Sequence, residues 1–357
     1  MFVTNSLLNI FNMQCKVNDS DTALYFVSGV LAKGLSARVG SPFFFRYGMT
    51  MEHKKDKPFK TIDEQLDILE NRNVKIPDRE EAKQFLLKEG YYSVINGYKD
   101  AFIDRKRSNE LNEDYYKDDT YFTSFMLIYT FDRALRRVTL GKLMNAEAIM
   151  KTASVYAFCF YNKDKDAYLD PASYCQSGDY HPRKNYTRNL IRLLGVLQRA
   201  HDNKNKDYIR HYLDKYGNVP LWVISNTLTF GNISAFYDLQ KAEVQNAICR
   251  NIRIASKKEI NEIGVKDVRK AFRILNEFRN ICAHEERLYC AKVGKTKEFS
   301  FKDMFDSLSV VLSRESMKNF SDDIREYLEI LGKESSLYIS ILEGMEISEE
   351  YLSKFSY

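Results

Sequence analysis

The distribution of proline constrains this chain more than any other feature, because proline interrupts helices and removes a backbone donor. All six prolines lie at apparent segment boundaries, and none occurs between Leu221 and Tyr357. Apolar residues recur at helical spacings of three and four, as at Phe125, Ile128 and Phe131. Alternating apolar and polar runs, the pattern of half-buried strands, are scarce. The sequence therefore predicts a mainly α-helical protein.

Composition narrows the class of protein without fixing its function. A hydrophobic content of 44% excludes a disordered chain, and the net charge of +5 suits a polyanionic partner without requiring one. The six cysteines show no CxxC spacing, so we expect no metal site, no disulfide framework and no cofactor. The longest apolar run, Ala23 to Ala32, is too short to span a bilayer, and the N-terminus lacks a basic signal region. We expect a cytoplasmic protein with no membrane partner.

Three regions follow one another along the chain. Residues 1–50 are rich in Ser, Gly and Phe and carry few charges, so we interpret them as an extension. Residues 51–118 form an N-terminal helical region that ends in a polar link over 104–119. Residues 119–357 are expected to form the main helical domain, which begins with a long helix over 121–156.

Two helices are expected in the N-terminal helical region. Thr61 and Glu64 have the spacing of a capping box and predict a helix that runs to about Asn71. A second helix is expected over about 79–88.

The stretch FRNICAHEERLYC, Phe278 to Cys290, places two arginines, an asparagine and a histidine among apolar neighbours on one expected helix. Steps of 100° per residue place six polar side chains within about 40° of one direction, in one stripe: Arg269, Arg273, Asn276, Asn280, His284 and Arg287. Apolar residues occupy the remaining arc, which predicts a buried helix or a helix at a subunit interface. Because unpaired buried charge is costly, the stripe is expected to face a cavity, a partner or an anion.

Arg279 and His284 form an R-x4-H pattern within this stretch. Arg279 lies about 100° from the stripe axis on an ideal helix, so its side chain has to bend round to reach His284. A pattern of two residues is weak by itself and leaves a structural role for His284 open.

Four segments resemble the bacterial abortive-infection family that includes AbiD and AbiF. They are KPFKTIDEQLDIL (Lys57–Leu69), FDRALRR (Phe131–Arg137), PLWVISNTLTFG (Pro220–Gly231) and RNICAHEERLY (Arg279–Tyr289), in the family's order. The resemblance implies an all-α, HEPN-type helical bundle, here with additional N-terminal helices. It also implies that Arg279 and His284 are a ribonuclease pair, with Asn280 as the polar residue that often follows the motif arginine.

Metal-free RNA cleavage suits these residue types. RNA carries its own nucleophile, the 2′-OH, and a histidine changes protonation near neutral pH and acts as base or acid. A guanidinium stays protonated and stabilises the charge that builds on the phosphorane. In HEPN enzymes two such motifs face each other, so the resemblance implies a homodimer with an isologous interface. It further implies an inhibitory, small structured RNA as a partner, while a catalytically silent RNA-binding module stays open as the alternative.

Several basic residues are candidate RNA contacts. They are the stripe residues Arg273 and Arg287, the FDRALRR residues Arg133, Arg136 and Arg137, and Arg183, Lys184 and Arg188, which alternate with tyrosines. Ion pairs with Asp132 and Glu147 are the alternative for the FDRALRR residues. In GYYSVINGYKDAF, Tyr91, Tyr92 and Tyr98 form either a stacking platform or an aromatic packing corner.

Overall fold

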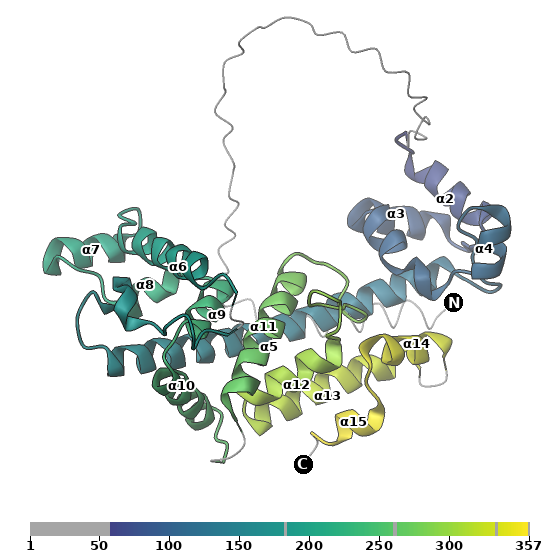
Figure 1. Cartoon of the computed structure of the whole chain (residues 1–357). Helices are drawn as coiled ribbons and strands as arrows, with labels where there is room; N and C mark the ends of the chain where they lie inside the picture. Colours follow the sequence, from purple (N-terminus) through teal and green to yellow (C-terminus); the bar gives the residue numbers. More distant parts are fainter. Residues whose placement is uncertain (1–57, 182–183, 260–262, 333–334, 356–357) are drawn as a thin grey trace, which may run out of the picture. The chain divides into compact units, whose positions relative to one another are not determined.

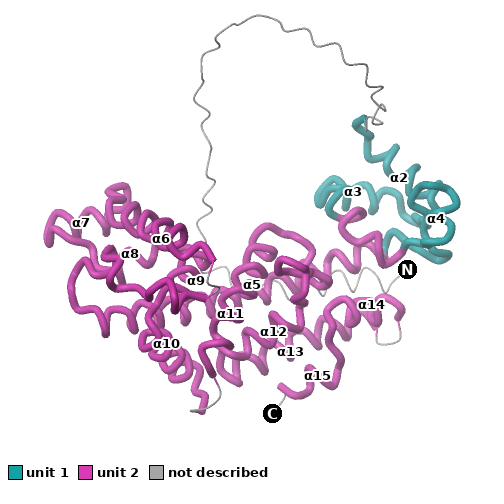
Figure 2. The backbone as a smooth tube through the Cα atoms, in the orientation of Figure 1, with its two compact units in different colours: residues 1–93, 103–123 teal, residues 94–102, 124–357 magenta. Residues whose placement is uncertain are grey.

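The computed structural model describes residues 58–181, 184–259, 263–332 and 335–355, and the predicted extension over 1–50 lies outside them. These residues form helices joined by turns and isolated bridges, without a strand, which confirms the all-α prediction (Figure 1). Among the described helices, none has the length and apolarity to cross a bilayer. The chain divides into two compact units, coloured separately in Figure 2.

The first unit, within the described residues, consists of 58–93 and 103–123. It contains α2 (Ile62–Asn71), α3 (Arg79–Glu89), α4 (Arg105–Leu111) and the first residues of α5 (Phe122–Tyr161).

The predicted capping box opens α2. The amide of Glu64 donates to Thr61 Oγ1 at 3.3 Å, and the amide of Thr61 donates to the Glu64 carboxylate at 2.8 Å. The segment expected as a polar link instead contains α4, because the Asp104 carboxylate caps the amides of Lys106 and Arg107. Local hydrogen bonds thus set where both helices begin.

The second unit consists of 94–102 and 124–357. Beyond α5 it contains α6 (Tyr186–His201), α7 (Asp207–Tyr216), α8 (Leu221–Ile224), α9 (Phe230–Asp238), α10 (Ala242–Ala255), α11 (Val265–Ala283), α12 (Phe301–Val311), α13 (Arg314–Ile330), α14 (Ser336–Met345) and α15 (Glu349–Ser353). Residues 94–102 belong to this unit rather than to the first, whereas the sequence placed one boundary at 118/119.

Helix α11 organises the core of the second unit. It packs most extensively against α12 and α9, and also against α10. Its buried face includes Phe272, whose ring lies 6.0 Å from that of Phe230 and 5.0 Å from that of Tyr237. The helix begins at Gly264, whose amide donates to the Asp267 carboxylate at 2.9 Å. This packing fixes the direction in which the end of α11 points.

Candidate functional site

Helix α11 ends at Ala283, and its C-cap residue is His284, the histidine of the R-x4-H motif. The His284 amide donates to the Asn280 carbonyl at 2.9 Å, and Glu285 turns the chain into the left-handed region with φ of 56°. The amide of Glu286 then donates to the Ile281 carbonyl at 3.0 Å. This is the longer-range of the two hydrogen bonds that define a Schellman cap. The backbone at the imidazole is therefore held by the helix and by its cap.

The His284 side chain is exposed, and so is that of Asn280 one turn earlier. An imidazole at the surface is accessible to solvent and to a ligand. Because residues four apart lie on the same face of a helix, the Asn280 amide and the imidazole share one surface.

The other motif residue, Arg279, points toward α5. Its Nε lies 3.5 Å from a carboxylate oxygen of Glu147, and its side chain is 23% exposed. The Nε atom is buried and makes no hydrogen bond, since the approach of Glu147 is not aligned for one. The described contacts include no hydrogen bond or ion pair between Arg279 and His284. The motif arginine is thus accessible in part and balanced by an acidic residue.

The segment after His284 is attached to α5 through Asp132. This carboxylate is fully buried and accepts the amides of Leu288 at 3.0 Å and Tyr289 at 2.7 Å. It also accepts the Tyr98 hydroxyl at 2.7 Å and the Arg136 guanidinium at 2.5 Å. We call these five residues the Asp132 network. It ties the chain immediately after the α11 cap to the long helix, and so restrains the position of the candidate site.

Among the three FDRALRR arginines, Arg136 is the one whose side chain is not available for contact with RNA. It is 5% exposed, donates to Asp132 and to the Tyr98 hydroxyl, and also donates to the Glu286 carbonyl at 3.3 Å. A guanidinium enclosed in this way has no surface for a phosphate, which contradicts the expectation of RNA contact. Arg133 and Arg137 are exposed.

The stripe arginines form ion pairs with acidic residues of the same chain. Arg269 pairs with Asp238 at 3.1 Å, and Arg273 pairs with Glu298 at 2.6 Å. The pKa of Glu298 is lowered to about 2 by hydrogen bonds to its carboxylate. The largest effect comes from the Thr296 hydroxyl, and Arg273 donates one of the others. These intramolecular ion pairs balance charge that was expected from the sequence to face a cavity, a partner or an anion.

Arg287, the last stripe arginine, is also held within the chain. It donates to the Gly97 carbonyl and lies 3.5 Å from the Asp100 carboxylate. Of the alternating basic and tyrosine segment, Lys184 and Arg188 are exposed, whereas Arg183 lies outside the described residues.

The tyrosines of GYYSVINGYKDAF have two different environments. Tyr98 is buried, its ring stacks on that of Tyr289 at 6.2 Å, and burial together with the Asp132 carboxylate raises its pKa. This is the aromatic packing corner. Tyr92 is 78% exposed and keeps a free ring face.

Of the two cysteines close to the motif, Cys282 is buried and Cys290 is partly exposed. Burial raises the pKa of Cys282 to about 12 and also raises that of Cys290. Both thiols therefore stay protonated near neutral pH and act as small apolar side chains.

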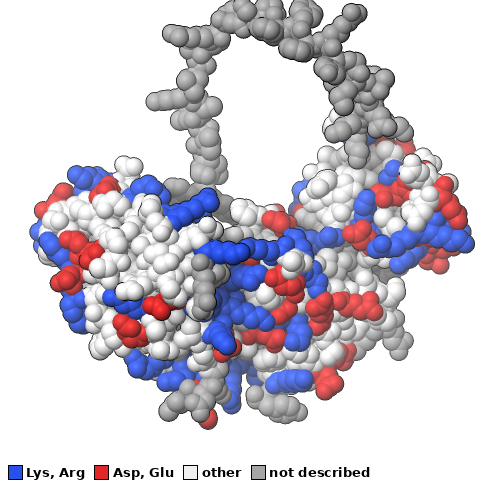
Figure 3. Space-filling view, in the orientation of Figure 1, with Lys and Arg blue, Asp and Glu red and all other residues white. Residues whose placement is uncertain are grey.

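The surface over α11 is rich in basic side chains. Figure 3 shows Lys and Arg gathered over the middle of this face, where Figure 1 draws α11, with acidic residues between them. The exposed basic residues of the helix are Lys266, Lys270 and Arg273. A surface of this kind attracts polyanions, in a manner that depends on salt.

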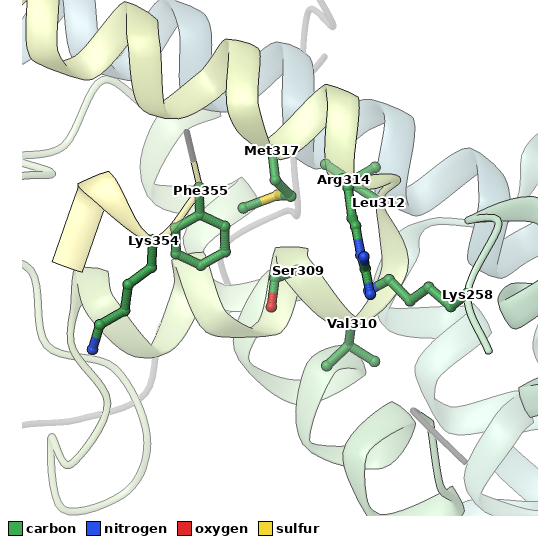
Figure 4. Close-up of a pocket in the computed structure, with 8 residues that line it drawn as sticks. All are labelled: Lys258, Ser309, Val310, Leu312, Arg314, Met317, Lys354 and Phe355. Carbon is green, nitrogen blue, oxygen red and sulfur yellow. The ribbon is translucent and has the colours of Figure 1, made fainter. Parts of the chain in front are cut away.

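Two cavities open on the second unit. The larger, of about 810 Å³, is lined by residues from the loop before α6 and from the starts of α10 and α11. The smaller, of about 390 Å³, is shown in Figure 4, where the ends of Lys258 and Arg314 approach each other and Lys354 lies on the opposite side. Neither cavity is lined by Arg279 or His284.

Comparison with known proteins identifies the family of this helical protein. A family model described as Abi-like protein matches residues 84–290, more than half of the chain. The chain therefore belongs to the Abi-like protein family, which associates it with abortive infection, a form of phage defence. The match spans the R-x4-H motif and the Asp132 network, and it begins after the Lys57–Leu69 segment. No curated protein and no solved structure matched.

Proposed function

We propose that this protein is a metal-independent endoribonuclease of phage defence, in which Arg279 and His284 act on an RNA phosphodiester. The observation that carries the proposal is the exposed imidazole of His284 at the capped end of the helix that also carries Arg279. Membership of the Abi-like family and the basic surface over α11 support it. We also propose that a small structured RNA inhibits the ribonuclease activity, and this part of the proposal rests on the family resemblance.

The chemistry uses the RNA's own 2′-OH as the nucleophile. A neutral imidazole accepts the 2′-OH proton while the 2′-oxygen forms a bond to phosphorus. The bond from phosphorus to the 5′-oxygen breaks, and a protonated imidazole donates to that oxygen. A guanidinium stabilises the charge on the phosphorane. The products are a 2′,3′-cyclic phosphate and a 5′-OH, and no metal takes part.

Two histidines serve this reaction better than one, because one accepts a proton while the other donates. This chain supplies one convincing motif, so we propose a homodimer in which two copies of the α11 end face a single phosphodiester. Light scattering is expected to give twice the subunit mass of 41.8 kDa under cleavage conditions. An active monomer would contradict the composite centre.

The Glu147 carboxylate limits the basal activity in this proposal. It lies 3.5 Å from Arg279 Nε, so an RNA phosphate has to compete with it for the guanidinium. A phosphate accepts two parallel hydrogen bonds from a guanidinium, which the present contact with Glu147 does not provide.

The test compares cleavage of single-stranded RNA in EDTA by wild type, His284→Ala and Arg279→Ala. General acid and base catalysis contributes about 10²- to 10⁴-fold, which is the loss expected of His284→Ala. Loss of one group that stabilises transition-state charge costs about 10²- to 10³-fold, which is the loss expected of Arg279→Ala. His211→Ala is the matched control, because His211 is also exposed but lies on α7. Cleavage by His284→Ala at the wild-type rate would refute the assignment.

A catalytically silent RNA-binding module is the second candidate. The pairing of Arg279 with Glu147, and the absence of a described contact between Arg279 and His284, favour it over a preassembled single-chain centre. It predicts salt-dependent RNA binding by wild type and by both variants, with no cleavage by any of them.

A further inference from the structure

Helix α5 presents an uncharged face to solvent within the second unit. Every residue of the helix between Arg137 and its end at Tyr161 is described, and none of the exposed ones is charged. We call seven of these exposed residues the α5 face: Gly141, Met144, Asn145, Ala148, Thr152, Tyr156 and Phe160. They recur at steps of three and four residues, so they form one continuous stripe about 28 Å long.

The lack of charge sets this face apart from other surfaces of the unit. The exposed positions of α13 are Arg314, Glu315, Lys318, Asn319, Asp322, Glu326 and Glu329, so all but Asn319 are charged. The charged residues of α5 closest to the face, Lys142, Glu147 and Lys151, have partners within the chain. Depletion of charge is typical of the core of a protein–protein interface.

Large apolar side chains stand out from the α5 face. Met144 is 59% exposed, Tyr156 is 65% exposed and Phe160 is 55% exposed. One aromatic side chain buries about 150–250 Å², so the exposed parts of the two rings amount to roughly 180–300 Å² in each copy of the chain. A standard interface takes about 800 Å² from each partner, so the rings supply about a quarter to a third of it and the other residues of the face extend the contact.

Gly141 has no reason within the described chain to be glycine. It lies inside α5, and a Cβ placed on it would meet no described atom within 4 Å. Glycine inside a helix is less favourable than alanine, and it is kept where another group has to approach the backbone closely. Because the described chain supplies no such group at this position, the glycine points to an approach from another molecule.

The motif arginine lies at the edge of the α5 face. Arg279 Nε is 3.5 Å from the carboxylate of Glu147, which lies three residues after Met144 and directly before Ala148. Residues three apart are neighbours on a helix surface. A molecule bound to the α5 face therefore lies beside Arg279. A second copy of this chain is the occupant that suits this place, since it brings the second motif that the proposed ribonuclease centre needs.

We propose that two copies of this chain associate through the α5 face, with the two α5 helices antiparallel about a two-fold axis at Ala148. Such an isologous contact pairs residues at equal distances on either side of the axis. Met144 then meets the partner's Thr152, and Gly141 leaves room for the ring of the partner's Tyr156. The motif arginines of both copies lie beside the axis. The inference rests on the proposed function for the identity of the occupant, and it places the contact on α5 instead of on the α11 stripe.

Sedimentation equilibrium of the full chain without RNA tests the interface. Wild type is expected to form a dimer. Ala148→Glu and Ala148→Lys are each expected to weaken association more than tenfold, because each variant places two like charges opposite each other at the axis. An equimolar mixture of the two variants is expected to restore the dimer, since the introduced carboxylate and ammonium then meet across the axis.

Two further variants keep the test specific. Asn246→Glu is the matched control, because Asn246 is also exposed but lies on α10, and it is expected to dimerise as wild type does. Gly141→Gln favours the isolated helix but fills the space for the partner's Tyr156, so it is expected to weaken association more than tenfold. Glu, Lys and Gln are good helix formers at exposed positions, so all of these variants are expected to fold, which circular dichroism checks.

A wild-type chain that stays monomeric throughout the micromolar range would overturn the proposal. So would undiminished association of Ala148→Glu, or a mixture of the two Ala148 variants that fails to associate. These measurements are independent of cleavage. If the α5 face forms the dimer and the chain cleaves no RNA, the proposed function fails and the interface stands. If cleavage depends on His284 while Ala148→Glu leaves the dimer intact, the interface fails and the proposed function stands.

Discussion

Asp132→Asn is expected to destabilise the second unit strongly. The carboxylate is fully buried, and four donors converge on it: the Tyr98 hydroxyl, the Arg136 guanidinium and the amides of Leu288 and Tyr289. Asparagine offers one oxygen in place of two, and its amino group would face donors. It also leaves the Arg136 charge buried without a counter-ion.

The magnitude follows from loss of one partner in a buried ion pair, which costs about 3–5 kcal/mol. For a unit of this size, 1 kcal/mol shifts Tm by about 2–4 °C, so Tm is expected to fall by about 6–20 °C. Calorimetry and urea unfolding measure the change. Asp322→Asn is the control, because Asp322 pairs with Arg325 at the surface and its loss is expected to cost about 0–1 kcal/mol.

A double variant, Asp132→Asn with Arg136→Met, separates charge burial from packing. Removing both charges is expected to cost less than the sum of the single changes, because no uncompensated cation is left. A loss of less than about 1 kcal/mol in Asp132→Asn, or strict additivity in the double variant, would refute the reasoning.

Three further predictions test the electrostatics of the molecule. Glu147→Gln removes the carboxylate beside Arg279 and is expected to tighten RNA binding by about 2- to 5-fold. Filter-binding assays at fixed salt measure the change. Unchanged affinity would mean that Glu147 does not compete with RNA. Arg133→Ala and Arg137→Ala are each expected to lower the slope of log affinity against log salt by about 0.7, and unchanged slopes would exclude this face from the RNA interface. Burial raises the pKa of the Asp238 carboxyl to about 6, and Arg269 opposes this shift. The protonated carboxyl therefore stabilises the folded state at low pH, and this stabilisation is lost as the pH rises through 6. Compared with Asp238→Asn in urea unfolding, wild type is expected to lose at most about 3 kcal/mol between pH 4 and pH 7, and parallel pH profiles would contradict this.

Local features of the fold were predictable from the sequence. The capping box of Thr61 and Glu64 acts within one helical turn, so its residue types and spacing were sufficient to predict it. The all-α fold followed in the same way from helical periodicity and the absence of proline after Pro220. The position of α4 was missed, although Asp104 at its start has the residue type of a helix cap.

The partners of charged residues were not predictable, because they lie far away along the chain. Asp132 bonds to amides 156 and 157 residues later, and Arg273 pairs with Glu298 from a separate loop. A partial signal for Arg136 was present, since Asp132 and Arg136 are four residues apart beside buried apolar positions. On the sequence alone, that ion pair was only the alternative to RNA contact.

Analysis of the RNA ends produced in EDTA tests the central claim most directly. Wild type is expected to yield 2′,3′-cyclic phosphate and 5′-hydroxyl ends, and to spare a substrate whose 2′-OH is removed at the cleaved position. His284→Ala is expected to yield neither product end above background. Ends that carry a 3′-hydroxyl and a 5′-phosphate, or equal product from His284→Ala, would contradict cleavage by this pair.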